Sequence, residues 1–287
     1  MKKNILILCS ILTINSCDIV EGPFITDADS YINPDKKVLI EDFTGHLCTN
    51  CPDAAREISA IHDLYPNQII VLAIHATTEY ARPYSDAQTD FQYDFRTKWG
   101  EEWDNNFGAS EIGLPRGMVN RIGGQSPTLG KDEWAAVVAN ELKKEIDLEI
   151  NISSNSESIT VTSDIQNNII GNFNLVVCLA ESNIINWQKD GVNNVEDYEH
   201  NHVLRTVLID DAISSSTNLV SGEQIVRSIE YDLEALEKFN TDYSSENLEE
   251  GNGNAGGWNA ANMSVIAFIY NTNSNEIVQV EEVDLNQ

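Results

Sequence analysis

Continuous apolar runs and helical periodicity alternate along the first half of the chain. Residues 37–43 and 68–75 are largely apolar runs, which is typical of strands buried on both faces of a parallel sheet. Between them, apolar residues recur at helical spacing from Pro52 to Tyr65, and Pro66 ends the pattern. Proline suits the first turn of a helix, where its missing N–H costs nothing. This order of strand, helix and strand predicts a βαβ unit.

Residues 76–110 interrupt this pattern with a stretch rich in aromatic and acidic side chains. We expect one or two helices here, whose aromatic residues either cap a sheet face or line a ligand pocket, since long insertions in compact domains are often functional. Pro115 then enters a segment at 112–121 that ends as a strand, where a proline fits best after a cis peptide bond. A helix is predicted over 131–145.

The second half of the chain changes to short strands separated by turns. Residues 148–153 and 158–165 alternate apolar and polar positions, as half-buried antiparallel strands do. Further strands are expected at 173–181, 201–209, 224–233, 265–270 and 277–283. This series of short strands with Asn, Gly and Ser turns predicts an all-β sandwich of immunoglobulin-like type over 148–287.

The composition is that of an acidic globular protein. The 287 residues carry a formal charge of −29, and 41% of them are hydrophobic. Because the chain is so negative and has no basic patch, it has no electrostatic means of binding nucleic acid. The length suggests two domains, which we place at 36–147 and 148–287.

The first residues predict a lipoprotein signal peptide over residues 1–16. The chain starts with two lysines, continues with an apolar stretch at residues 5–14, and places the small Ser16 directly before Cys17. Cys17 would then be the lipidated first residue of the mature chain and its anchor in the membrane. An ordinary signal peptide followed by an incidental Cys17 is the alternative. Residues 17–35 lack periodicity and predict a flexible tether, and no later segment is long enough to cross a bilayer.

The candidate chemistry lies where the first predicted strand meets the first predicted helix. A Gly turn leads to Cys48 and Cys51, a Cys-x-x-Cys pair at the start of the helix. A thiolate at a helix N-terminus is stabilised by unpaired N–H groups and by the macrodipole, which lowers its pKa and makes it a nucleophile. The second thiol lies one turn away and can resolve a mixed disulfide. Cys178 lies in an apolar run, where a buried and unreactive thiol is expected.

Two other uses of this pair stay open. Cys48 and Cys51 can form a structural disulfide that never cycles, as is common in an oxidising envelope. They can also contribute to a zinc site with His46 and His75, although no second Cys pair completes a ligand set. No motif for a cofactor stands out.

Other histidines and acidic residues are weaker candidates. A protonated His46 would favour the Cys48 thiolate as a modulator, but a lone loop histidine is more often a plain surface residue. His200 and His202 are expected on one face of a strand, where they could bind a metal or, more simply, fix the strand edge through hydrogen bonds. Residues 190–197 form an acidic stretch that could hold calcium, although a solvated loop is the simpler interpretation. We therefore predict no metal site.

Taken together, the motifs resemble two known groups of proteins. Cys48-x-x-Cys51 at a strand-to-helix turn, followed by Leu114-Pro115 before a strand, resembles the thioredoxin fold over residues 36–147. More narrowly, the chain is similar over nearly all of its mature length to the Omp28-type family of Gram-negative outer-membrane lipoproteins. The segments that carry this second resemblance are 43–52, 114–121 and 198–205.

The thioredoxin resemblance implies a role for each residue at the site. Cys48 would be the more exposed, attacking thiol, and Cys51 would be the resolving thiol. Pro115 would pack against the disulfide, and the backbone of Leu114 would pair with an extended substrate.

The chain also departs from that pattern. Leu47 stands where most thioredoxin-like reductants have Trp, and Thr49-Asn50 replaces Gly-Pro between the cysteines. The first strand offers Glu41 and Asp42 as its candidates for a buried acid. Because the dipeptide between the cysteines tunes the redox potential, the direction of electron flow stays open.

The sequence thus predicts a lipid-anchored outer-membrane protein of the cell envelope. Its expected fold is an α/β thioredoxin-like domain followed by an all-β immunoglobulin-like sandwich. Its expected function is thiol–disulfide exchange with an envelope protein or a small thiol, without a cofactor. The alternative is a non-enzymatic surface protein for binding or adhesion, in which Cys48–Cys51 is a structural disulfide.

Overall fold

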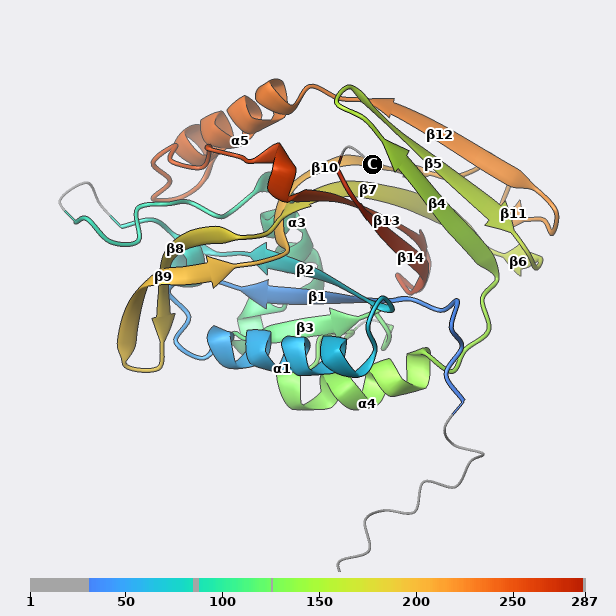
Figure 1. Ribbon diagram of the computed structural model, residues 1–287, viewed down its shortest axis with the longest axis horizontal. Helices are drawn as coiled ribbons and strands as arrows, with labels where there is room; N and C mark the ends of the chain where they lie inside the picture. Colours follow the sequence, from blue (N-terminus) through green and yellow to red (C-terminus); the bar gives the residue numbers. More distant parts are fainter. Residues whose placement is uncertain (1–30, 85–87, 125, 286–287) are drawn as a thin grey trace, which may run out of the picture. The chain divides into compact units, whose positions relative to one another are not determined.

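A mixed sheet of seven strands holds together the part of the chain that the structure describes (Figure 1). The structure is a computed structural model that describes residues 31–84, 88–124 and 126–285. The predicted signal peptide at residues 1–16 and the lipidation candidate Cys17 lie outside the described residues. Across the sheet the strands follow the order β14-β13-β7-β10-β2-β1-β3.

The predicted βαβ unit is present at one end of this sheet. β1 (Val38–Thr44) and β2 (Ile69–His75) pair in parallel, and α1 (Cys51–Leu64) connects them. Every residue of both strands is buried, which explains why their sequences are largely apolar. Pro52 lies in the first turn of α1, as expected.

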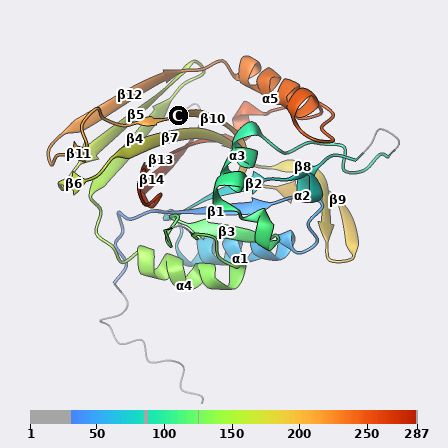
Figure 2. The same ribbon diagram turned by 180° about the vertical axis from the view of Figure 1, so that it is seen from behind.

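The strand that follows Pro115 lies antiparallel to β1. The Leu114–Pro115 peptide bond is cis, as predicted, and β3 (Arg116–Val119) pairs with β1 directly after it. α4 (Lys131–Glu141) and α1 pack against the same face of β1, β2 and β3 through a common apolar core. Figures 1 and 2 show both helices on this side of the sheet.

The aromatic insertion between β2 and β3 forms helices, as expected. They are α2 (Thr78–Ala81), α3 (Lys98–Phe107) and the short η2 (Ser110–Ile112). The indole of Trp103 on α3 enters a second apolar core, which lies on the sheet face opposite α1 because neighbouring strand residues point to opposite faces. This aromatic side chain therefore caps the sheet.

Strands from the second half of the chain extend the same sheet. β10 (Val203–Ala212) lies parallel beside β2, where the backbone N–H of Ala73 donates to the carbonyl oxygen of His202 (2.8 Å). One apolar core runs from β1 and β2 to the later strands. The predicted segments 36–147 and 148–287 therefore share a sheet and a core, and residues 32–287 form one compact unit. The later strands of this sheet are β7 (Phe173–Glu181), β13 (Met263–Asn271) and β14 (Ile277–Asp284).

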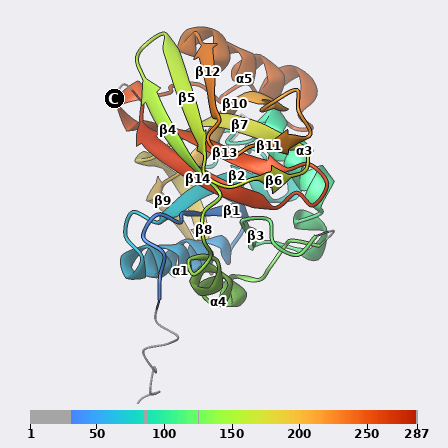
Figure 3. The same cartoon turned by 90° about the vertical axis from the view of Figure 1, so that its right-hand side faces the viewer.

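A separate three-stranded sheet packs against these later strands (Figure 3). It contains β12 (Gln224–Glu230), β5 (Ser158–Ile165) and β4 (Leu148–Ser154), in that order. Every second residue of β5 is buried, as the alternating sequence predicted. The two layers enclose a third apolar core, to which β7 contributes its alternate residues. Mixed α/β structure with two packed sheets is thus the observed architecture. Two short strands, β6 (Ile169–Ile170) and β11 (Asn218–Leu219), pair with each other, and η3 (Ala260–Asn262) is a short 3-10 helix.

The expectation of an all-β second half is wrong at one place. α5 (Leu233–Asn247) follows β12, and the strand expected over 224–233 ends at Glu230. Asp232 begins the helix because its carboxylate accepts a hydrogen bond from the backbone N–H of Ala235 (3.1 Å). The fully buried residues of α5 are polar, but Leu233 and Leu236 pack against the core between the two sheets. With Phe239 and Tyr243 they recur at helical spacing, a pattern that could have predicted the helix. Within the described ranges, no helix is long and apolar enough to cross a membrane.

Candidate functional site

The Cys-x-x-Cys pair lies at the junction of β1 and α1. Cys48 and Cys51 form a disulfide, and Cys51 is the first residue of α1. A tight turn leads into the pair, because the backbone N–H of Cys48 donates to the carbonyl oxygen of Gly45 (3.0 Å). The expectation that Cys48 is the more exposed thiol is wrong, since both cysteines have an exposed fraction of 3%.

A hairpin that the sequence did not predict explains this burial. β8 (Ile184–Asp190) and β9 (Asn193–His200) form a separate two-stranded sheet that turns at Gly191. The loop expected at 190–197 is therefore wrong, because most of it belongs to β9. Most residues of this strand are exposed, so it lacks the apolar alternation by which strands are recognised.

The backbone of this hairpin is hydrogen-bonded to the cysteine loop. Lys189 donates its N–H to the carbonyl oxygen of His46 (2.9 Å), and Gly191 donates its N–H to that of Thr49 (2.8 Å). The two acceptors lie on either side of Cys48 along the chain. The hairpin therefore lies over the disulfide loop along its length.

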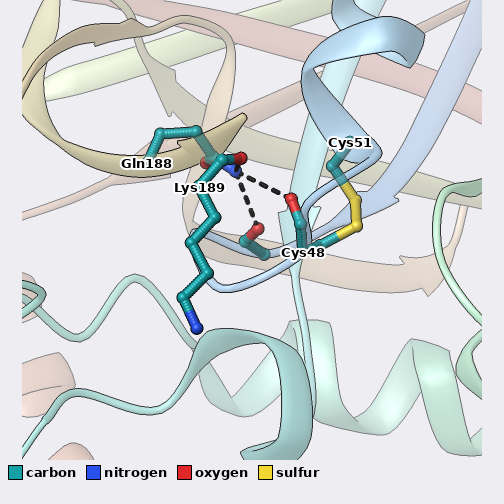
Figure 4. The surroundings of a disulfide bond; sticks show 5 residues. Cys48, Cys51, Gln188 and Lys189 are labelled. Carbon is teal, nitrogen blue, oxygen red and sulfur yellow. Dashed lines mark hydrogen bonds between the residues drawn. A yellow bond between two sulfur atoms is a disulfide. The ribbon is translucent and has the colours of Figure 1, made fainter. Parts of the chain in front are cut away.

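The side chain of Gln188 fixes the same loop (Figure 4). Its amide donates to the carbonyl oxygens of Cys48 (3.1 Å) and Gly45 (3.3 Å). Only 3% of Gln188 is exposed, so these hydrogen bonds are shielded from water. The position of the Cys48 backbone thus depends on a residue from the other half of the chain.

Pro115 and Leu114 lie near the same end of β1. Arg116, the first residue of β3, pairs with Phe43, so the cis-proline falls beside the end of β1 that continues into the cysteine loop. Both residues are half-buried. Their place in the sheet agrees with the sequence, and their roles remain predictions.

His46 is buried rather than on the surface. Its exposed fraction is 0%, its Nε2 lies 2.8 Å from the carbonyl oxygen of Arg82, and its ring meets Phe91 and Phe95 edge-on. Burial lowers the pKa of His46 to about 4. The ring is therefore neutral at pH 7 and does not supply the positive charge that would favour the Cys48 thiolate.

Two further histidines contact the same aromatic cluster. The rings of His75 and His200 both meet Phe95, with centroids 4.6 Å and 4.5 Å from it, and lie 5.7 Å from each other. Burial lowers the pKa of His200 to about 3 and that of His75 well below its usual value. The expectation that His200 and His202 share a strand face is wrong. His200 ends β9, and His202 lies in a turn with a φ of 58°.

The described residues contain no group of three or more His, Cys, Asp or Glu side chains placed to hold a metal ion. Neither the zinc alternative at the cysteine pair nor the calcium alternative at 190–197 gains a ligand set from them.

A pocket of about 310 Å³ opens beside the disulfide. Residues from α1, the ends of β1 and β2, the hairpin, and the turn before β10 line it. Cys51 is one of the lining residues, and Asp42 from β1 is another. The pocket therefore brings together the helix-end cysteine and a carboxyl group that lies six positions before Cys48 in the sequence.

The structure separates the two acidic residues of β1. Glu41 forms a buried ion pair with Arg121 (2.6 Å) on the opposite sheet face. Asp42 faces the pocket with an exposed fraction of 4%, and its Oδ1 has no hydrogen-bond partner among the described residues. Burial raises its pKa to about 7. The alternation of side chains along a strand could have distinguished the two, but the sequence does not show which face holds the arginine.

Comparison with models of protein families finds a match over more than half of the chain. Residues 101–287 match the family described as outer membrane protein Omp28, and these residues include the hairpin, β10 and the cis-proline. The chain belongs to the Omp28 family. It is therefore a cell-envelope protein of an outer-membrane family. No curated protein matches it by sequence.

Several solved structures resemble this Omp28-family chain. HBP35 of Porphyromonas gingivalis is 17% identical, with a TM-score of 0.59 over 88% of this chain and 76% of that one. Protein AGR_C_4864 from Agrobacterium tumefaciens is 12% identical, with a TM-score of 0.52 over 88% of this chain and 95% of that one. At these identities the likeness concerns the fold alone. A domain of the outer membrane lipoprotein Omp28 from Porphyromonas gingivalis matches 50% of this chain and 91% of that one at 16% identity, with a TM-score of 0.24.

Proposed function

We propose that this envelope protein performs thiol–disulfide exchange through Cys48 and Cys51. The observation that carries the proposal is the position of the disulfide, at the N-terminus of α1 and beside a pocket that contains the buried carboxyl group of Asp42. A thiolate is favoured at a helix N-terminus, and a nearby group with a pKa of about 7 can exchange protons at physiological pH.

The proposed fold is a thioredoxin-like unit followed by an immunoglobulin-like sandwich, with a lipid on Cys17 that holds the chain at the outer membrane. The order β1, α1, β2, then cis-Pro115 and the antiparallel β3, supports the first part. The two packed sheets of the second half support the other.

In the proposed reaction, the thiolate of Cys48 attacks one sulfur of a substrate disulfide and releases the other as a thiolate. Asp42 then accepts the proton of the Cys51 thiol, and the Cys51 thiolate attacks the sulfur of Cys48. The Cys48–Cys51 disulfide forms and the second substrate sulfur leaves as a thiolate. The substrate is thus reduced by two electrons and the dithiol is oxidised. The substrate would be an envelope protein or a small thiol compound.

The hairpin sets a condition on this reaction. Both cysteines are 3% exposed, and the hairpin is hydrogen-bonded to residues on both sides of Cys48. A protein substrate therefore reaches the Cys48 sulfur only when the β8–β9 hairpin moves away from the loop.

The same burial favours a second candidate function. A disulfide enclosed by a hairpin and fixed by Gln188 is also what a structural cross-link requires. In that case the protein is a non-enzymatic binding module of the cell surface, and Cys48–Cys51 stabilises the loop.

The redox potential of the pair distinguishes the two functions. We would equilibrate the purified chain with a glutathione series and a dithiothreitol series, and measure the reduced fraction by alkylation and mass shift. A potential between about −120 and −270 mV is expected for exchange, whereas a value below about −300 mV indicates a structural disulfide.

Activity provides the second test. Cys48→Ser should abolish the reduction of insulin disulfides, while the matched control Cys178→Ser should retain it, because Cys178 is a buried free thiol in the sheet. Activity that persists in Cys48→Ser would refute the exchange proposal.

A further inference from the structure

The pocket beside Cys51 contains more unpaired polar groups than the exchange reaction uses. Both ring nitrogens of His75, and Oδ1 of Asp42, lack a hydrogen-bond partner among the described residues. Each of these side chains is only 4% exposed, and both line the pocket. Buried polar atoms without hydrogen-bond partners cost free energy, so a molecule that enters the pocket and supplies those partners gains binding free energy.

The shape of the pocket suits a small, elongated molecule. Its volume of about 310 Å³ is at the lower end of the range for ligand sites. The lining positions on α1 run from Cys51 to His62, which corresponds to roughly 16 Å along a helix at 1.5 Å per residue. Pro52, Ala55 and Ile58 give this wall an apolar surface.

The charges around the pocket favour a cation. No lysine or arginine is among the described residues that line it, whereas Asp42 and Glu199 are. Burial keeps the lining His75, His200 and His202 neutral at pH 7. An anionic ligand would thus meet no opposite charge here, while a cationic ligand would meet the Asp42 carboxylate.

We propose that the pocket binds a small organic amine. The ammonium group donates hydrogen bonds to Oδ1 of Asp42 and to the acceptor nitrogen of His75, and an apolar body lies against α1. An ammonium group has three donors and no acceptor, which fits a carboxylate and a neutral imidazole. The site shares Asp42 and the pocket with the proposed exchange reaction, but binding can be measured apart from that reaction because it requires no free thiol.

Binding should depend on pH through Asp42. With a pKa of about 7, this carboxyl group is about one-tenth ionised at pH 6 and about nine-tenths ionised at pH 8. The affinity for an amine is therefore expected to rise about tenfold between these pH values. The strand beside Asp42 adds no titratable group, because Gly117 of β3 lies opposite it. The other titratable groups that line the pocket come from α1, β2, β9 and the turn before β10: His62, His75, Tyr198, Glu199, His200 and His202.

The test is isothermal titration of the full-length chain, with its disulfide intact, against probes of matched size. 2-Phenylethylamine should bind at least tenfold more tightly than 2-phenylethanol, and 3-phenylpropionate should bind least. The amine should bind about tenfold more tightly at pH 8 than at pH 6. Nα-acetyl-lysine methylamide, tested in parallel, shows whether an ammonium group on a protein enters as well as a free amine; saturable binding of either supports the proposal.

Variants assign the binding to the pocket. Asp42→Asn should remove both the preference for the amine and its dependence on pH, while Glu199→Gln at the exposed rim should retain both. Ala55→Trp, at an exposed position of α1, should block binding by filling the pocket while the carboxyl group stays in place. Four results would each overturn the proposal: equal affinity for amine and alcohol, tighter binding of the anion, unchanged binding in Ala55→Trp, or no saturable binding of any amine. In the last case the pocket would hold water alone. Since the disulfide stays oxidised, none of these results depends on exchange activity.

Discussion

Replacement of Asp42 by asparagine should stabilise the protein at and above neutral pH. Burial raises the pKa of this carboxyl group from 3.8 to about 7. Between these values the folded state keeps a proton that the unfolded state has lost, so stability falls as the pH rises and the loss is complete above pH 7. At about 1.4 kcal/mol for each pKa unit, the loss is about 4 kcal/mol at pH 8. Water that enters the pocket reduces this figure, which is therefore an upper bound.

The assay is urea denaturation of the oxidised chain at pH 5 and pH 8. At pH 5 the destabilisation by Asp42 corresponds to only about one of the three pKa units of its shift. The gain in the free energy of unfolding from Asp42→Asn should therefore be about 2–3 kcal/mol larger at pH 8 than at pH 5. Asp63→Asn, at an exposed position of the same pocket-lining helix, should change stability by about 0.5 kcal/mol or less at both pH values. Identical pH profiles for wild type and Asp42→Asn would refute the reasoning, because the carboxyl group would then ionise as freely in the folded state as in the unfolded one.

Three other changes probe the surroundings of the site. Gly117→Ala would place a Cβ 2.6 Å from the Trp134 ring and 2.9 Å from the Glu41 carbonyl oxygen, so a loss of about 2–3 kcal/mol is expected in urea denaturation; a loss below 0.5 kcal/mol would contradict the packing of α4 on β3. Arg121→Met leaves the Glu41 carboxylate buried without its partner, which should cost about 3–5 kcal/mol, and adding Glu41→Gln should restore part of it. His46→Phe should make the protein less sensitive to acid. The pKa of His46 is about 4 in the folded state and 6.5 in the unfolded state, so wild type loses about 3 kcal/mol of folding stability as the pH falls through that range. The variant should lose correspondingly less stability between pH 7 and pH 4, as measured by urea denaturation.

The elements of the first half could be predicted because local pattern and final environment agree. β1 and β2 are buried along their whole length, and their apolar sequences state this directly. Pro52 marks the start of α1, and Pro115 marks the cis bond before β3. In each case the conformation follows from the residue itself or from its near neighbours.

The two elements that the sequence patterns did not predict, β9 and α5, differ in the signal that they carry. β9 is mostly exposed and polar, and it is held as a strand by its pairing with β8. α5 has a helical signal in Leu233 and Leu236, which pack against the core, although its fully buried residues are the polar Asn240 and Ser244. Periodicity does not detect a mostly exposed strand such as β9, even though its partner β8 directly precedes it in the chain.

The candidate site around Cys48 and Cys51 also combines features that the sequence predicts with features that only the tertiary structure sets. By itself the sequence determined that Cys48 and Cys51 lie at the start of a helix, because strand, turn and helix signals are contiguous. Only the tertiary structure decided that both sulfurs are buried, since the hairpin that covers them comes from residues 184–200. It also decided that Asp42, and not Glu41, meets the pocket beside Cys51, because Arg121 lies on the other face of the sheet. Burial and pairing at a distance set the pKa and access of these groups, and both arise only when the two halves of the chain share one sheet.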